Sequence, residues 1–305
     1  MCDTAPAWQA PAPLRAANWR LRGHRPTHLR AFSQRIVEAC RRSQPRWLLA
    51  TGLAPLDAAA LRDIGVLGVT RLNFLTDDPW NPAQRGSWLL DALPHYDRVF
   101  SPRHANLNDL RALGCAGVAY LPFAYDPDVD HPAGPSDPGD PGALKCDVLF
   151  AGGADSDRAA WVGALIEAGL DVGLYGGYWE RYPATRGAVR GMLRAELLPQ
   201  AAAAAAIALC LVRRANRDGH AMRSYEMAAM GACLLAEDTE DHRELYGSEG
   251  EAALYFSTVD DLLQKARRLL ADADLRGRMR RGALARVTSR PNKYADRLRS
   301  MLEAA

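Results

Sequence analysis

Short apolar runs alternate with helix-patterned segments along most of this chain, and this alternation constrains the fold more than any other feature. The segment THLRAFSQRIVEACRR places apolar residues at helical spacing, and the apolar run RWLLATG follows it. Strand-like and helix-like segments then take turns through GVAYLPF, which ends at residue 123. Because parallel neighbouring strands need crossovers of this length, the pattern predicts an α/β fold with doubly wound layers.

One segment interrupts the alternation near the middle of the chain. Residues 126–145, DPDVDHPAGPSDPGDPGALK, consist mainly of proline, glycine and aspartate, which cannot bury enough apolar surface to form a core element. The alternation resumes at residue 146, and 305 residues with 48% hydrophobic side chains suffice for two cores. We therefore expect a Rossmann-like domain over 1–125, a linker over 126–145 and a second Rossmann-like domain over 146–288. A C-terminal helix over 289–305 could cross back to the first domain.

The charged residues argue against a nucleic-acid partner. The chain has 38 basic and 36 acidic residues, which leaves a formal charge of +2, and the arginines are spread along the sequence. A protein that binds a nucleic-acid backbone concentrates positive charge on one face or element. We therefore expect no nucleic acid among the partners.

The cysteines and the apolar segments predict a cytoplasmic protein. The six cysteines include no Cys-x-x-Cys pair and show no zinc spacing with histidine, which is typical of reduced thiols and predicts no metal site. The N-terminus is rich in proline and lacks the continuous apolar core of a signal peptide. No apolar stretch is long enough to span a bilayer, so we expect no transmembrane segment.

The stretch RDGHAMRSYEMAAMGACLLAE, residues 217–237, is the strongest candidate for a functional site. It lies between two apolar runs that we expect to be strands, IALCLVR and ACLLAE. The spacing predicts a helix over 222–230, which Gly231 ends. The polar loop NRDGH then brings its groups to the carboxyl end of one strand and to the N-terminus of this helix. Free backbone N–H groups and the helix dipole favour an anion there, such as a phosphate.

Two side chains in the predicted helix fit this interpretation. Arg223 in the first turn could make a charge-assisted contact with a phosphate. Glu226, three residues later on the same face, could accept hydrogen bonds from a vicinal diol such as a ribose. The alternative is a surface ion pair between Arg223 and Glu226, which is common and contributes little.

Two glycine pairs follow strand-like segments of the second half. Gly152 and Gly153 end CDVLFAGG, and Gly176 begins the second pair, after the run LDVGLY. Only glycine lets a backbone approach a diphosphate closely, although tight turns use glycine as often. Arg158 could reach the same diphosphate, and the alternative is a solvated arginine on a helix.

The stretch also carries a resemblance to a known family. Asp218, Gly219 and Glu226, followed by MAAMGACLLAED, resemble the motif of retaining glycosyltransferases with the GT-B fold, and more closely that of the CgeB-like glycosyltransferases. Those enzymes have an acidic residue, seven further residues and then a glutamate at the head of a helix. The first acid is usually glutamate, so Asp218 is a shorter substitute. The segments LNFLTDDPW, YDRVFSPRHANLNDLRALG and AYLPFAYDPDVDHP are similar to the family as well, so the likeness covers about residues 46–300.

The resemblance implies a fold and an activity. Two Rossmann-like domains would face a cleft, the second would bind a nucleoside-diphosphate sugar and the first an unknown acceptor. The sugar would be transferred with retention, without a metal ion or other cofactor. Arg223 would stabilise the leaving diphosphate, Glu226 would bind the ribose, and Asp218 and His220 would contact the sugar. Family members begin with a further strand and a glycine-containing loop, which predicts a shortened N-terminal domain here.

Three alternatives stay open at this point. An inverting enzyme would need a protein base, and Asp77, Asp78 and His104 follow predicted strands, although the two aspartates could be turn residues before Pro79. A sugar-nucleotide epimerase could share the fold and the nucleotide site. A non-catalytic relative could bind a nucleotide sugar or a partner protein with the same surface.

Overall fold

The computed structural model describes residues 2–134 and 140–305, and the chain divides into two compact units. The first unit consists of the described residues up to Pro122 together with Ala215–Arg217 and Leu298–Ala305. The second unit consists of the described residues of Phe123–Arg214 and Asp218–Arg297. Of the predicted linker, residues 135–139 lie outside the described residues, and the rest belong to the second unit.

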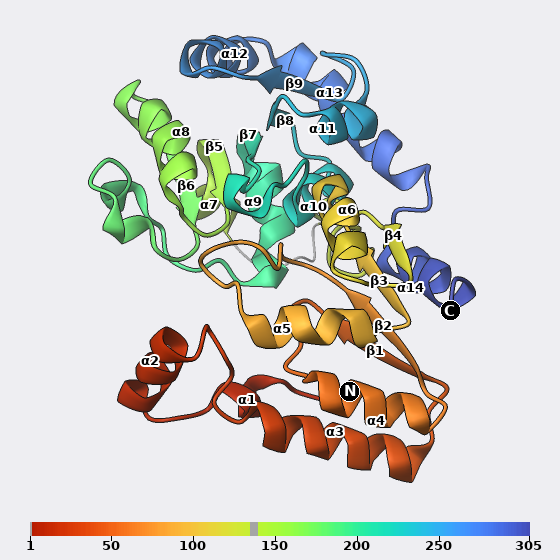
Figure 1. Cartoon of the computed structure of the whole chain (residues 1–305). Helices are drawn as coiled ribbons and strands as arrows, with labels where there is room; N and C mark the ends of the chain where they lie inside the picture. Colours follow the sequence, from red (N-terminus) through yellow and green to blue (C-terminus); the bar gives the residue numbers. More distant parts are fainter. Residues whose placement is uncertain (1, 135–139) are drawn as a thin grey trace. The chain divides into compact units, whose positions relative to one another are not determined.

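The strands of the first unit form a four-stranded parallel sheet (Figure 1). They are β1 (Trp47–Thr51), β2 (Thr70–Phe74), β3 (Arg98–Ser101) and β4 (Val118–Tyr120), in the spatial order β1-β2-β3-β4. A complete doubly wound sheet reverses its strand order once. The consecutive order found here corresponds to one half of such a sheet.

Helices cover this sheet and close its core. They are α1 (Ala5–Trp8), α2 (Ala12–Leu21), α3 (Leu29–Ser43), α4 (Ala58–Val66), α5 (Ser87–Ala92), the 3-10 helix η1 (Leu93–His95) and α6 (His104–Ala112). The buried side chains of α3 include Leu29, Phe32, Ile36 and Cys40, which share one face of the helix at a spacing of three to four residues. This apolar face packs beside α4, and the two helices run next to each other in Figure 1.

The second unit contains a five-stranded parallel sheet that reverses its order. Its strands are β5 (Cys146–Ala151), β6 (Val172–Tyr175), β7 (Ala205–Cys210), β8 (Leu234–Glu237) and β9 (Ala253–Phe256), in the spatial order β6-β5-β7-β8-β9. The chain moves from β5 to β6 on one side and then returns to place β7 on the other side of β5. The switch point of this doubly wound sheet therefore lies between β5 and β7.

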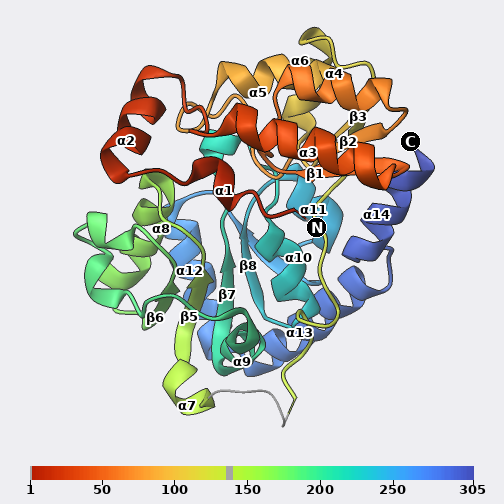
Figure 2. The ribbon, with the colours of Figure 1, turned by 90° about the horizontal axis from the view of Figure 1, so that it is seen from below.

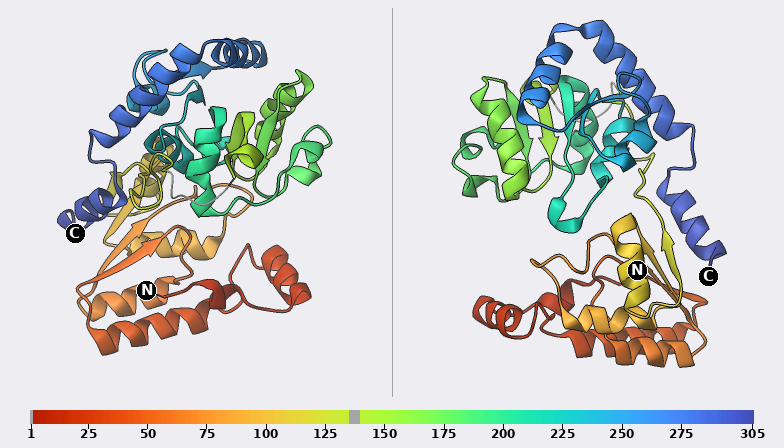
Figure 3. Two further views of the ribbon diagram at one scale, coloured as in Figure 1. Left: turned by 180° about the vertical axis from the view of Figure 1, so that it is seen from behind. Right: turned by 45° about the horizontal axis from the view of Figure 1, so that its top comes forward.

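Helices lie on both faces of the second sheet, as Figures 2 and 3 show. They are α7 (Pro141–Leu144), α8 (Ser156–Glu167), α9 (Leu198–Ala204), α10 (Met222–Ala229), α11 (Glu240–Tyr246), α12 (Val259–Ala271) and α13 (Ala273–Thr288). The 3-10 helices are η2 (Trp179–Arg181), η3 (Arg186–Ala188), η4 (Ala195–Leu197) and η5 (Arg214–Asn216), and α14 (Tyr294–Glu303) lies within the predicted C-terminal helix. In Figure 2, α9 and α10 lie over one face of the strands while α8 and α12, which contact each other, lie on the other. The strands between them are apolar on both faces, as is typical of a parallel sheet covered on both sides.

Two elements differ from the sequence-based expectation. The alanine tract predicts a helix through residue 206, but β7 already begins at Ala205, where it pairs with Cys146 of β5. Alanine has the highest helix propensity, but propensity is a weak preference that strand pairing in the centre of a sheet overrides. The resemblance to the glycosyltransferases implies a loop after β8, but this segment forms α11, whose N-cap Thr239 accepts a hydrogen bond from the N–H of His242 at 3.1 Å.

Two general properties follow from the described residues. None of the helices that the structure describes is long and apolar enough to cross a membrane. Within residues 2–134 and 140–305, no group of three or more His, Cys, Asp or Glu side chains is arranged to hold a metal ion.

Candidate functional site

The loops at the switch point of the second sheet define the candidate site. Gly152 and Gly153 directly follow β5, Arg213 lies in the loop after β7, and α10 begins at Met222. In open parallel sheets, ligands bind at the carboxyl ends of the strands where the strand order reverses. The residues that the sequence singles out therefore lie at the edge of the sheet where this rule expects a ligand.

A cavity of about 150 Å³ opens at this edge of the second unit. Its walls come from both glycine pairs, from the segment before α9 and from the first turn of α10. The lining residues are Ala151, Gly152, Gly153, Tyr175, Gly176, Gly177, Met192, Leu193, Arg194, Ala195, Leu198 and Arg223. Backbone without side chains forms one wall and two arginines face it, a combination that suits an anionic ligand.

The glycines in the cavity wall differ in the structural reason for having no side chain. Gly176 has φ +130°, and a Cβ atom there would lie 2.1 Å from the carbonyl oxygen of Gly152, so no other residue fits. Gly153 has ordinary space for a Cβ, and Gly177 has open space around it. The absence of side chains at Gly153 and Gly177 therefore keeps the cavity open rather than relieving a clash within the chain.

Arg223 and Glu226 form an ion pair in the wall of this cavity. Arg223 donates from Nε to the carbonyl oxygen of Ala151 at 3.1 Å and from Nη1 to Oε2 of Glu226. The side chain of Glu226 is only 7% exposed, whereas that of Arg223 is 41% exposed and lines the cavity. Burial lowers the pKa of Arg223, and the nearby Asp130 opposes this shift. The pair predicted as an alternative thus exists, but it is buried on the glutamate side and belongs to the cavity wall.

The N-terminus of α10 lacks a side-chain cap. Its N-cap is Ala221, which has no side-chain acceptor for the N–H groups of the first turn. The hydroxyl of Ser224 instead accepts from the N–H of Ala221 at 3.0 Å and contacts Nε2 of His242 at 2.8 Å. His242 donates in turn from Nδ1 to the carbonyl oxygen of Glu237 at 2.8 Å. This chain of hydrogen bonds fixes the start of α10 against α11 and the end of β8. The first turn of α10 stays open to an anion.

His242 is neutral in this network. It is fully buried, and burial lowers its pKa to about 4. Its Nδ1 donates to a carbonyl and its Nε2 accepts from a hydroxyl, which assigns the proton to Nδ1. The histidine was not singled out from the sequence, because nothing in its neighbours signals burial.

Asp218 closes the loop that follows β7. Its Oδ2 accepts from the N–H of Arg213 at 3.2 Å, and its own N–H donates to the Arg213 carbonyl at 3.3 Å. Arg217, just before it, has φ +53°, which completes the tight turn. The predicted contact between Asp218 and a sugar stays a prediction, since this carboxylate already holds the loop.

Gly219 and His220 pack the same loop against α11. A Cβ at Gly219 would lie 2.3 Å from Oδ2 of Asp241, so this position requires glycine. His220 is 2% exposed, and its Nδ1 lies 2.8 Å from the same Oδ2. Its Nε2 accepts from the N–H of Phe123 at 3.3 Å, which leaves the proton on Nδ1. Both nitrogens are therefore used by the protein in this conformation, and the predicted contact of His220 with a substrate stays a prediction.

Arg158 lies behind the cavity rather than in it. The residue is 7% exposed, and its guanidinium donates to the carbonyl oxygens of Gly153, Leu211 and Val212 at 3.1, 3.2 and 3.3 Å. It therefore ties the loop after β5 to the loop after β7, across the switch point. This geometry differs from the predicted direct contact with a diphosphate, and burial also lowers the pKa of Arg158.

The structure adds three residues that were not predicted for the site. Arg194 lines the cavity, and Nη2 of Arg213 lies 3.6 Å from the position of a Cβ at Gly153. Glu237 is buried at the end of β8, where it accepts from the N–H of Val212 at 2.8 Å. Arg213 ends the apolar run IALCLVR and Glu237 ends β8, so the rule that located Gly152 could have located them as well.

The residues considered as bases in the first unit are engaged there. Asp78 is 1% exposed, accepts from the N–H of Trp80 at 2.9 Å and pairs with Nε of Arg217, in the same unit, at 2.6 Å. His104 stacks on Tyr120 with ring centroids 3.8 Å apart. The bond to Trp80 is the turn contact that the sequence offered as the alternative for Asp78.

The second half of the chain is similar in sequence to a known family. Residues 158–303, just under half of the chain, match the family described as "Glycosyl transferase-like". The matched segment includes the loop after β7 and the whole of α10. No curated protein matches the chain in sequence.

Solved structures share the fold of the whole chain. A sucrose-phosphate synthase from Thermosynechococcus elongatus is 15% identical, with a TM-score of 0.65 over 91% of this chain and 79% of that one. The Anabaena protein HepE, solved in complex with UDP, is 15% identical, with a TM-score of 0.62 over 90% and 81%. A Listeria monocytogenes protein assigned as a UDP-N-acetylglucosamine 2-epimerase is 14% identical, with a TM-score of 0.54 over 91% and 80%. These likenesses confirm the predicted GT-B fold with its two parallel sheets.

Proposed function

We propose that this chain is a glycosyltransferase that moves a sugar from a nucleoside-diphosphate donor to an acceptor not yet identified. The observation that carries the proposal is the position of Arg223, which lies at the N-terminus of α10 and in the wall of a glycine-lined cavity at the switch point. A donor diphosphate needs positive groups and backbone that it can approach closely, and this edge of the sheet offers both.

The diphosphate would occupy the cavity. The backbone at Gly153 and Gly177, the first turn of α10 and Arg223 would hold it, and Arg194 and Arg213 lie close enough to assist. On departure of the diphosphate these groups would stabilise the charge that grows on it in the transition state. Fixed arginines and a helix dipole can supply that stabilisation, so we expect activity without a metal ion or other cofactor.

Glu226 would bind the ribose of the donor. Its Oε2 pairs with Arg223, while its Oε1 makes no hydrogen bond to the residues that the structure describes and can accept from a hydroxyl. The pairing orients the carboxylate. Asp218 and His220 would lie toward the sugar, and their hydrogen bonds to Arg213 and Asp241 would order that side of the site.

We infer retention of configuration and membership of the CgeB-like group from the pattern of Asp218, Gly219 and Glu226. In that scheme the leaving diphosphate helps to deprotonate the acceptor hydroxyl, so no protein base is needed. We also expect the protein in the cytoplasm, where nucleotide sugars are present as substrates.

The test is a donor screen. The protein is incubated with a panel of nucleotide sugars that begins with UDP-sugars, since UDP occupies the related HepE structure, and stabilisation is measured by thermal shift. Release of nucleoside diphosphate is then followed with candidate acceptors, with and without EDTA. A lack of any shift would reject the donor site, and loss of turnover in EDTA would reject metal-independent transfer.

An epimerase is the second candidate, favoured by the likeness to the Listeria monocytogenes protein. It would convert the donor into an isomeric sugar without an acceptor, which chromatography of the same reactions detects. Binding without transfer, hydrolysis or isomerisation would instead identify a non-catalytic relative.

A further inference from the structure

The N-terminal segment carries a charge excess that the whole-chain balance hides. Residues 1–56 contain nine arginines, no lysine and only two acids, Asp3 and Glu38, a net charge of +7. The remaining 249 residues contain 29 basic and 34 acidic residues, a net charge of −5. A local excess of this size points to an anionic partner of this segment.

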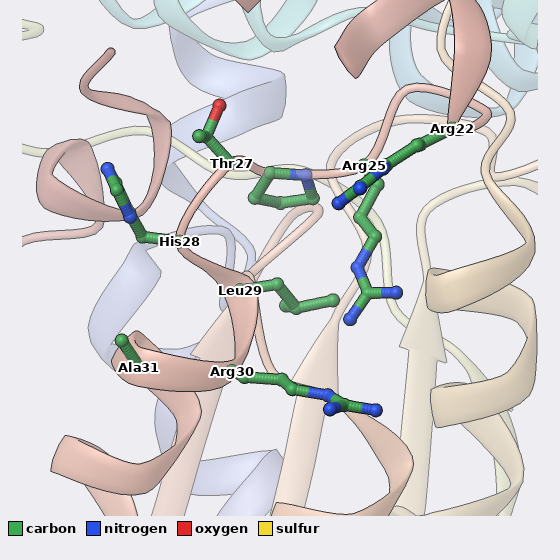
Figure 4. A pocket seen from close by; sticks show the side chains of 8 residues that line it. Arg22, Arg25, Thr27, His28, Leu29, Arg30 and Ala31 are labelled. Carbon is green, nitrogen blue, oxygen red and sulfur yellow. The ribbon is translucent and has the colours of Figure 1, made fainter.

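A hollow of about 470 Å³ lies within this segment, entirely in the first unit. It is lined by Arg22, at the end of α2, and by residues 25–31, which lead into the first turn of α3. Figure 4 shows the side chains of Arg25 and Arg30 extending to the same side of the chain, with Leu29 between them. Hollows of this size lie in the range of small-ligand sites.

The three arginines of the hollow have no protein partner. Within the described part of the chain, the guanidinium groups of Arg22, Arg25 and Arg30 make no ion pair or hydrogen bond. Glu38, the nearest acid in sequence, pairs with Arg41 instead. Three guanidinium groups around one hollow repel each other unless an anion lies between them.

The backbone holds these arginines in place. The buried side chain of Asn18 donates to the carbonyl oxygen of Arg25 at 2.8 Å, and the backbone carbonyl of Asn18 accepts from the N–H of Arg22 at 2.9 Å. Gly23 and His24, between them, both have φ of +56°, which forms a tight turn. The positions from which Arg22 and Arg25 extend are therefore fixed before a ligand arrives, which reduces the entropy lost on binding.

The start of α3 adds to the positive field. Its N-cap is His28, whose side chain makes no cap hydrogen bond, and the hollow reaches from this residue into the first turn. The positive end of the helix dipole thus faces the same space as Arg30.

We propose that this hollow binds the phosphate group of an anionic ligand, supplied either by a soluble organic phosphate or by a phospholipid headgroup. Arginine pairs with phosphate through two parallel N–H donors, and three arginines can hold all of its oxygens. Leu14 and Leu21, which are 54% and 83% exposed, lie seven residues apart on one face of α2 and would meet acyl chains if the source is a lipid. The proposal does not depend on the donor site of the second unit.

The test compares two double variants that lose the same charge. R25Q/R30Q removes two arginines of the hollow, and R35Q/R42Q removes two exposed arginines of α3 that do not line it. Each protein, on the wild-type and on the R223Q background, is titrated with pyrophosphate and cosedimented with vesicles of phosphatidylcholine with or without phosphatidylglycerol. We expect R25Q/R30Q to bind at least about tenfold more weakly than R35Q/R42Q on both backgrounds.

Each outcome decides the proposal. A selective loss of pyrophosphate binding supports a soluble phosphate, and a selective loss of phosphatidylglycerol binding supports a lipid headgroup. Equal weakening in both double variants would mean that only bulk charge matters, and no weakening in R25Q/R30Q would mean that the hollow binds nothing. R25K/R30K, which keeps the charge, should restore part of the binding, and circular dichroism verifies that every variant is folded.

Discussion

The Nδ1–H of His220 donates to Oδ2 of Asp241 at 2.8 Å, and this bond joins the loop after β7 to α11. Because Nε2 accepts from the N–H of Phe123, the pair fixes one neutral tautomer of the imidazole. Gly219 packs against the same carboxylate, where any other residue would clash. Asp241 thus positions the loop that carries Asp218 and His220 to the candidate site.

We expect the substitution Asp241→Asn to destabilise the second unit. An asparagine that turns its NH₂ toward Nδ1 forces the other tautomer, and Nε2–H then opposes the N–H of Phe123. A buried donor without an acceptor costs about 1–3 kcal/mol, which urea unfolding measures. Asp238→Asn is the matched control, because Asp238 pairs with Arg243 at the surface and such pairs contribute at most about 1 kcal/mol. Equal losses in both variants would contradict the special role of Asp241.

Gly176→Ala should close the candidate cavity and strain the backbone. The new Cβ would lie 2.1 Å from the Gly152 carbonyl oxygen at a φ of +130°, so both glycine loops must move. We expect a loss of at least about 2 kcal/mol in unfolding free energy and no measurable nucleotide binding. Gly187→Ala, where nothing lies within 4 Å of the added atom, should leave both quantities unchanged. A variant G176A that still binds nucleotide would show that the ligand lies elsewhere.

Arg223→Gln and Arg158→Gln should separate ligand binding from stability. Arg223 lines the cavity and is 41% exposed, so its loss should weaken UDP binding by about 10–100-fold with little change in stability. Arg158 is buried on three carbonyl groups, so its loss should cost about 2–4 kcal/mol of unfolding free energy. Calorimetric titration with UDP and urea unfolding of both variants check the two effects. If Arg158→Gln instead weakened UDP binding and Arg223→Gln instead lowered stability, Arg158 would be the ligand of the diphosphate.

Much of the fold could be predicted from the sequence because parallel strands are short apolar runs between amphipathic helices. The runs around Leu72, Val148 and Leu235 are buried strands as expected. The start of β7 was misplaced, since an alanine tract has helix propensity but no periodicity, and only pairing with β5 decides its structure. The N-cap Thr239 and the acidic first turn of α11 were visible signals that were not used.

The sequence brings the candidate residues to one cavity, but their individual contacts were less predictable. Strand ends and glycine pairs indicate where a ligand can bind, and Arg223 and the glycines do line one cavity. Whether a polar side chain faces that cavity depends on carbonyl groups and carboxylates far away in sequence. Arg158 is held by carbonyls more than fifty residues away, and His220 by Asp241, which composition and spacing do not reveal.

Because His242 is buried, we expect the free energy of unfolding to depend on pH. Burial lowers its pKa to about 4, whereas the unfolded chain has the ordinary value of 6.5. Between these values the unfolded state binds a proton and the folded state does not, so stability falls as pH falls, by up to about 1.4 kcal/mol per pH unit. About one pH unit above 6.5 the histidine is almost entirely neutral in both states and its contribution to the pH dependence vanishes.

Urea unfolding at pH 7.0, 6.5, 5.5 and 5.0 measures this effect at constant ionic strength. The free energy of unfolding of the wild type should be nearly constant between the first two points and should fall by about 1–2 kcal/mol over the last three. His242→Gln can keep one hydrogen bond without titrating, so it should be less stable at pH 7 but should lose most of the slope. The same slope in both proteins would assign the acid sensitivity to other groups, and a flat wild-type curve would mean that His242 is accessible to protons in the folded state.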